Sequence, residues 1–209
     1  MRHPSRVIAL AFAAISLTAC AHPQPPPPVV DLAQMQCSPA VRLDDATPLI
    51  LDKDGEKRET ALLDGNVHCV EEPSGYRSLY RVFALPAMAP SIVTVSAQPW
   101  GNTMLPPRAA FLDASGKTVR ETTHADFTFR GAVLSALLRS HPGESYLVLL
   151  SDADVLGHSV SRISGSIQTN YAAAGPVLIA MYTGRDTTTN LVFTPVGNVT
   201  VSIAPLPTK

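Results

Sequence analysis

SIVTVSA, residues 91–97, alternates strictly between the two sides of an extended chain. Ile92 and Thr94 fall on one side, and Val93 and Val95 fall on the other, which is the period of two of a β-strand. Most of these side chains are β-branched or apolar, as is typical of strands that pack on a core. The stretch therefore predicts a strand with at least one buried face.

Further short apolar runs lie on both sides of this stretch and are separated by turn residues. Residues 132–138 also suit a helical turn, but the bounding Gly131 and the Pro-Gly pair at 142–143 favour a strand. Only residues 153–159 indicate a short helical turn, and the chain lacks the long crossover helices that a parallel α/β sheet requires. We therefore expect an all-β sandwich, jelly-roll or immunoglobulin-like, of about nine or ten strands. The other expected strands are residues 79–85, 108–113, 117–122, 126–130, 132–138, 145–150, 177–182, 190–194 and 198–203.

The N-terminus carries the pattern of an export signal. Two arginines precede an apolar run, residues 7–17, that has about the length of a signal-peptide core. LTAC, residues 17–20, then resembles the bacterial lipobox, in which the cysteine sulfur receives a diacylglyceryl group, the peptide is cut before the cysteine, and its new amino group is acylated with a fatty acid such as palmitate. The pattern predicts a lipoprotein signal peptide at residues 1–19 and a lipid on Cys20. The alternative is an ordinary signal or membrane segment with a chance cysteine, although the run is too short to span a bilayer.

The residues after the lipobox predict where the protein lies and how it is held. Ala21 is not the aspartate that retains enteric lipoproteins in the inner membrane, so the resemblance implies an outer-membrane protein that faces the periplasm. Residues 20–36 are rich in proline and predict an extended linker. Such a linker would hold the sandwich domain, residues 37–209, up to about 45 Å from the membrane.

Two cysteines remain once Cys20 is acylated, namely Cys37 and Cys69. In an oxidising compartment this pair predicts a disulfide bond. Two free thiols or half of a metal site are the alternatives, and the chain has no second cysteine pair to complete such a site.

The charge of the chain excludes one class of partner. It has 16 Lys+Arg against 17 Asp+Glu, and removal of the signal peptide would take away two of the arginines. This weakly acidic balance gives no basic face for a nucleic acid. The chain also lacks a glycine-rich phosphate loop, a Cys-x-x-Cys pair and the regular spacing of metal ligands, so we expect no cofactor and no metal.

Three segments in the middle of the chain resemble the maltose-operon periplasmic protein family (MalM-like). They are SLYRVFALP at residues 78–86, PPRAAFLD at residues 106–113 and ESYLVLL at residues 144–150. The resemblance covers roughly residues 60–152. It implies a periplasmic or lipid-anchored accessory protein linked to uptake of maltose or maltodextrin, and it supplies no catalytic residues.

GHSVS, residues 157–161, is the strongest candidate for an enzyme motif. It resembles a nucleophile elbow around Ser159, but Ser161 stands where the sharp turn needs a second glycine. No histidine follows Ser159, which excludes the α/β-hydrolase order of serine, acid and histidine. His124 and His141 are conceivable bases, and the order His124, Asp126 or Asp152, then Ser159 stays formally open.

Trp100 is the remaining candidate site residue. It lies in a turn-like loop, where an aromatic ring either binds a sugar or a protein partner or folds back onto the core. Because no reactive set converges in the sequence, we predict a non-catalytic binding or accessory protein that contacts the membrane through its lipid. Its partners would be envelope proteins or carbohydrate. The alternatives are a serine hydrolase that acts on envelope polymers and a structural subunit of an envelope complex.

Overall fold

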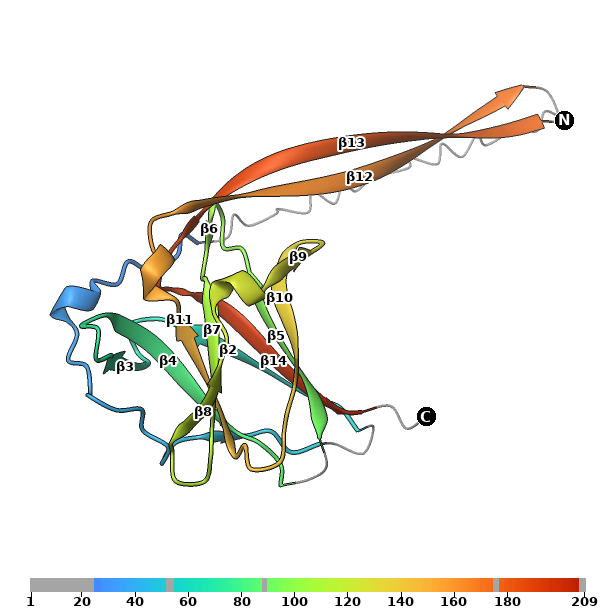
Figure 1. Ribbon diagram of the computed structural model, residues 1–209. Helices are drawn as coiled ribbons and strands as arrows, with labels where there is room; N and C mark the ends of the chain where they lie inside the picture. The colour runs from blue at the N-terminus through green and yellow to red at the C-terminus, as the bar shows by residue number, and fades with distance from the viewer. Residues whose placement is uncertain (1–24, 52–54, 88–89, 175–176, 207–209) are drawn as a thin grey trace, which may run out of the picture.

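Two β-sheets pack face to face, and a long two-stranded arm projects from one end of this sandwich (Figure 1). The computed structural model describes residues 25–51, 55–87, 90–174 and 177–206. The expected all-β sandwich is confirmed. The described residues form fourteen strands, more than the nine or ten expected, because short edge strands and the first strand of the arm carry weak sequence signals.

The first sheet runs in the order β1-β4-β11-β7-β8, and β3 pairs with the beginning of β4. Only the short β1 pairs in parallel, and the rest of this sheet is antiparallel. Its strands are β1 (Thr47–Pro48), β3 (His68–Glu71), β4 (Arg77–Ala84), β7 (Pro107–Leu112), β8 (Thr118–Glu121) and β11 (Tyr146–Ser151).

The second sheet is entirely antiparallel and runs in the order β2-β14-β5-β10-β9. Residues 132–138, which also suited a helical turn, belong to a strand of this sheet, β10. Its strands are β2 (Lys57–Leu63), β5 (Ser91–Gln98), β9 (Thr128–Arg130), β10 (Val133–Arg139) and β14 (Gly197–Pro205).

The strict alternation at residues 91–97 places one face of β5 in the core between the sheets. Val93, Val95 and Ala97 are fully buried, and their neighbours Ile92 and Thr94 are half-buried on the other face. β5 is paired on both edges, by β10 and β14, so it lies inside the sheet. The stretch that predicted the fold is therefore a central strand.

β11 is apolar on both sides because both of its faces are covered. Leu147 and Leu149 face the core between the sheets. Val148 and Leu150 belong to a second apolar cluster, against which partly buried side chains of the N-terminal segment 41–46 pack. The first sheet is thus a layer with chain on both sides, which explains the unbroken apolar run.

A third sheet forms the arm. Its two strands, β12 (Ser159–Ala174) and β13 (Val177–Phe193), pair along their whole length, and β6 (Thr103–Met104) pairs with β13 only at Val192 and Phe193. The sequence predicted strands at residues 177–182 and 190–194, which are the two ends of β13. It gave no strand for β12.

The helical segments of the described residues are three short 3-10 turns, η1 (Leu32–Gln34), η2 (His124–Asp126) and η3 (Ala153–Val155). The last of these is the beginning of the turn expected at residues 153–159. No helix among the described residues is long and apolar enough to cross a membrane.

The N-terminal segment packs against the sandwich. Arg77 Nη1 donates hydrogen bonds to three of its backbone carbonyl groups, and Trp100 Nε1 donates to the carbonyl group of Pro25. Val30, Leu32 and Met35 pack against the core. Residues 25–36 therefore do not extend away from the domain, and the reach of the expected linker is shorter than its length in the sequence.

Candidate functional site

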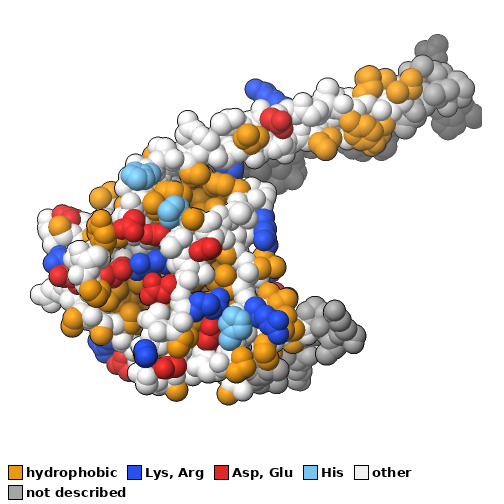
Figure 2. Space-filling model, viewed as in Figure 1, with side chains coloured by type: hydrophobic (Ala, Val, Ile, Leu, Met, Phe, Trp, Pro, Cys, Tyr) orange, Lys and Arg blue, Asp and Glu red, His pale blue; other side chains and the backbone are white. Residues whose placement is uncertain are grey.

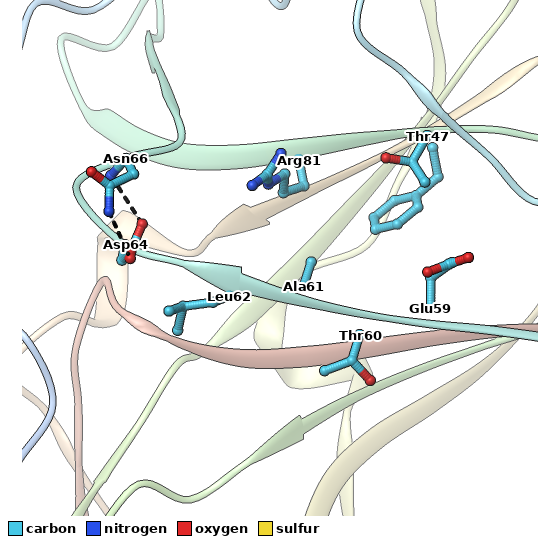
Figure 3. A pocket seen from close by; sticks show the side chains of 9 residues that line it. Thr47, Glu59, Thr60, Ala61, Leu62, Asp64, Asn66 and Arg81 are labelled. Carbon is cyan, nitrogen blue, oxygen red and sulfur yellow. Dashed lines mark hydrogen bonds between the residues drawn. The ribbon is translucent and has the colours of Figure 1, made fainter. Parts of the chain in front are cut away.

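A groove opens on the side of the sandwich where β2 of the second sheet faces β4 of the first. Figure 3 shows Arg81 and Thr47 along one wall and Glu59, Ala61 and Asp64 along the other. Its volume is about 390 Å³, within the usual range for small-molecule sites. The complete lining is Thr47, Glu59, Thr60, Ala61, Leu62, Asp64, Asn66, Arg81 and Phe83.

The sequence of β2 explains why the sandwich stays open here. Glu59, Ala61 and Leu63 share one face of the strand because side chains alternate. Leu63 is fully buried and closes the core, whereas the small Ala61 and the charged Glu59 cannot do so. The inward face of β2 therefore changes from apolar to polar along its length, and the groove follows the strand from Glu59 to Asp64.

The groove offers several kinds of hydrogen-bonding group. Glu59 is paired with Lys57 at 2.8 Å. Asp64 accepts hydrogen bonds from the backbone and side-chain nitrogens of Asn66. Within the described part of the chain, the Arg81 guanidinium has no hydrogen-bond or ion-pair partner. A fixed set of acceptors beside an unpaired five-proton donor suits a small ligand rich in hydroxyl groups.

A second cavity, of about 500 Å³, brings together two residues of the candidate catalytic motif around Ser159. His124 and Ser159 both line it, together with a group of phenylalanine side chains. Asp152 lies behind His124, and its Oδ2 atom accepts hydrogen bonds from His124 Nδ1 at 2.9 Å and from the His124 backbone nitrogen at 3.1 Å. The order histidine, aspartate, serine that was formally open in the sequence is thus gathered at one place.

The other candidate members of that motif lie elsewhere. Asp126 accepts hydrogen bonds from Thr123 at the start of η2. His141 pairs with Glu144, and these two residues line a different cavity. Only His124 and Asp152 can therefore be considered as partners of Ser159.

The electrostatics of Asp152 follow from its surroundings. Burial alone would raise the pKa of its carboxyl group, but hydrogen bonds from the ring and the backbone of His124 lower that pKa below its ordinary value. The carboxylate also accepts from the Asp154 backbone nitrogen and so caps η3. Asp152 therefore ties η2 to η3, whether or not the cavity has a catalytic role.

Ser159 lacks the local geometry of an activated nucleophile. It is the first residue of β12 and is exposed, and no hydrogen bond joins its hydroxyl group to His124 within the described residues. A catalytic serine needs a base within hydrogen-bonding reach and oxyanion donors beside a tight turn. The cavity therefore supports ring packing around His124 better than acyl transfer.

We expect a fluorophosphonate probe to leave Ser159 unlabelled, because no base shares its proton. The measurement is mass spectrometry of the purified chain after exposure to the probe, with a serine hydrolase as a positive control. Labelling that disappears in Ser159→Ala and persists in Ser161→Ala would show the opposite and would establish a nucleophile at this cavity.

The predicted Cys37–Cys69 disulfide is confirmed, with the two Cα atoms 4.5 Å apart. Cys20 lies outside the described residues, so its acylation stays a prediction. Trp100 is half-buried, and its indole N–H is used by the carbonyl group of Pro25. This contact places the ring against the N-terminal segment, and ligand binding at Trp100 also stays a prediction.

Sequence reasoning did not identify Glu59, Asp64 or Arg81 as candidate residues. The signal that could have found the groove is the pair of charged residues Lys57 and Glu59 on the same face as Leu63, which is unusual on the inward face of a strand. It was not interpreted because this stretch was not predicted as a strand.

No family model matches the chain, and no curated protein matches it. The resemblance of its middle segments to the maltose-operon periplasmic protein family therefore stays a hypothesis.

Proposed function

We propose that this protein is a non-catalytic, lipid-anchored binding protein on the periplasmic side of the bacterial outer membrane. Its ligand would be a small carbohydrate, bound in the groove between β2 and β4. The observation that carries this proposal is the groove itself, with the unpaired Arg81 beside Glu59 and Asp64. Planar polar side chains of these types pair well with sugar hydroxyl groups because they offer both donors and acceptors.

Maltose or maltodextrin is the carbohydrate class that the family resemblance favours. The anchoring part of the proposal rests on the lipobox-like residues 17–20. The observed disulfide supports an oxidising compartment, because such bonds persist in the periplasm and are rare in the cytosol.

Replacement of Arg81 by alanine should weaken sugar binding about 10- to 100-fold, because a hydrogen bond to a charged group contributes about 1.5–3 kcal/mol. Isothermal titration calorimetry of the full chain with maltose and maltotriose measures this change. Arg58→Ala is the matched control, since Arg58 is an exposed arginine of the same strand as Glu59 and does not line the groove. Equal losses in both variants, or no binding heat with the unmodified chain, would count against the groove.

Acylation at Cys20 gives a separate prediction. Metabolic labelling with a palmitate analogue should mark the unmodified chain and leave Cys20→Ala unmarked, because the thioether forms only on a cysteine at that position. Sucrose-gradient fractionation should then place the labelled protein with outer membranes. Equal labelling of both chains would remove the anchor from the proposal.

A serine hydrolase is the second candidate function, and the meeting of His124, Asp152 and Ser159 is the observation in its favour. The fluorophosphonate experiment distinguishes it from the binding protein.

A further inference from the structure

The arm exposes a large apolar surface. Of the eleven large hydrophobic side chains that are exposed among the described residues, six belong to β12 and β13. Figure 2 shows apolar side chains along the distal part of the arm, beyond its charged residues. From Ile163 to Gly184 the sequence has no Asp, Glu, Lys, Arg or His. The six side chains are Ile163, Ile167, Tyr171, Ile179, Met181 and Tyr182.

Four of these side chains lie on one face of the arm. The register pairs Ile167 with Gly184 and Tyr171 with Ala180, and it pairs Tyr182 with Thr169. Since opposite residues of an antiparallel pair share a face, Ile163, Ile167, Tyr171 and Tyr182 form one apolar face. We call it the apolar face of the arm.

The other face is polar over most of its length and is directed toward the sandwich at the root of the arm. It carries Ser164, Ser166 and Gln168, and it becomes apolar only near the tip. At the root, Val160 packs against the core and Arg162 Nη1 donates a hydrogen bond to the carbonyl group of Ala132. The apolar face therefore starts on the side of the arm that is turned away from the domain.

An isolated ribbon of this kind needs a further contact. Within the described residues, the outer edges of β12 and β13 pair with no other strand except at the two positions joined to β6. Two-stranded hairpins are at best marginally stable in water, and exposed apolar faces of this extent mark interaction surfaces. Burial of the four side chains of the apolar face would make such a contact strong.

The chain itself indicates what lies near this face. Pro25, the first described residue, is bonded to Trp100, and Trp100 pairs with Thr103, which begins the strand beside the root of the arm. Only four residues separate Pro25 from Cys20 in the sequence, and the five residue steps between them span at most about 18 Å. A lipid on Cys20 would hold the root of the arm close to the bilayer.

The arm is too long to stand on its tip in that position. The ten residues from Val192 to Tyr182 rise about 33 Å at about 3.3 Å per residue. An upright arm rooted close to the membrane would push the open backbone edges of its strands into hydrocarbon, so the arm is expected to lie along the surface. One long face of the arm, rather than its tip, then meets the lipid.

We propose that the arm is a lipid-binding element that lies along the membrane with its apolar face in the headgroup and acyl-chain boundary. The proposal rests on the acylation of Cys20 in the proposed function. Tyr171 and Tyr182 are residues of the kind that settle at this boundary. Ribbon edges at that depth keep access to water, which deeper burial in hydrocarbon would deny them.

The charges of the arm agree with a lipid partner. Arg162 and Arg185 lie on the polar face, away from the apolar side chains. Asp186 shares the apolar face, but it lies toward the root. The lipid tether allows the root to stand slightly above the membrane surface while the distal part touches it. A shallow tilt therefore immerses the distal part, from Ile167 to the tip, and leaves Asp186 and the neighbouring Ile163 in water.

The test uses neighbouring positions on opposite faces. Ile167→Cys and Gln168→Cys are each labelled with the fluorophore NBD in the full acylated chain, since Cys37 and Cys69 are occupied by their disulfide. The chains are reconstituted in vesicles of phosphatidylethanolamine and phosphatidylglycerol with nitroxide-bearing lipids. We expect a blue shift and strong quenching at position 167, and less than about one third of that quenching at position 168.

Equal quenching at the two positions, or none at either, would overturn the proposal. Arm-to-arm crosslinks between copies without quenching would show that a second copy covers the face instead of lipid. In the Cys20→Ala chain, Ile167→Ser with Tyr182→Ser should lower vesicle partitioning about tenfold. The partitioning measurement does not need the lipid on Cys20. Palmitate labelling therefore tests the lipid anchor of the proposed function, and the fluorescence and partitioning measurements test membrane binding by the arm.

Discussion

Removal of the Cys37–Cys69 bridge should lower the free energy of unfolding by about 3–4 kcal/mol, because the bond closes a loop of roughly 33 residues. The variant is Cys37→Ala with Cys69→Ala, which leaves no polar group in the buried site of Cys69. Urea unfolding followed by circular dichroism measures the loss.

The bridge also fixes the N-terminal segment, so the loss should be partly local. Cys69 belongs to β3, and Ser38 next to Cys37 pairs with Val70 of the same strand. Without the bond, residues 25–46 are held only by hydrogen bonds, such as those to Arg77, Trp100 and β3, by an ion pair and by apolar contacts, and proteolysis should cut them first. Strong reductant should bring the unmodified chain to the level of the variant. A loss below about 1 kcal/mol would show that packing alone holds this segment.

The sandwich could be predicted because two sequence signals define its central strands: the alternation of side chains along the strand and the turn residues that bound it. Residues 91–97 are β5, and the turn signal at residues 114–116 separates β7 from β8 as expected. In that turn Gly116 has φ of 84°, a conformation that a side chain disfavours. In these strands and this turn, the local preferences of the residues and their burial in the fold favour the same structure. The strands and the turn could therefore be predicted from residue types alone.

The arm could not be predicted from the same rules. β12 has four serines and single glycine, glutamine and asparagine residues among its 16 residues, and such residues are typical of loops. Its extended conformation comes from pairing with β13 over its whole length, a contact that sequence spacing does not reveal. Residues 177–182 and 190–194 were recognised because they are apolar, and the polar residues between them hid the continuity of the strand.

The candidate groove was missed for a related reason. Arg81 belongs to a strand that was predicted, but Glu59 and Asp64 come from a stretch that was not. They meet because β2 and β4 lie at the same open side of two different sheets. A site made between sheets depends on topology, whereas the lipobox and the cysteine pair depend on local order and composition.

Replacement of Asp152 by alanine should lower the free energy of unfolding by about 2–4 kcal/mol, because it leaves three partly buried donors without their buried acceptor. The Asp152 side chain is 5 % exposed and accepts from His124 Nδ1, from the His124 backbone nitrogen and from the Asp154 backbone nitrogen. Asp152→Asn keeps an acceptor oxygen and should cost about half as much. Equal losses in the two variants would show that a neutral acceptor recovers none of the loss and that the whole effect depends on the carboxylate charge.

The pH dependence of this difference gives an independent test of the His124–Asp152 pair. The pKa of Asp152 is lowered in the folded chain, so its contribution is present above the ordinary aspartate pKa of about 3.9 and is lost as the pH falls through the folded value. The stability gap between the unmodified chain and Asp152→Asn should therefore shrink as the pH falls below about 4. Asp113→Asn is a matched control with a lowered pKa in an exposed turn, where its carboxylate bonds Ser115 and Lys117 and not a histidine. A gap for Asp152 that widens at low pH would contradict the assignment of a stabilised, buried carboxylate behind His124.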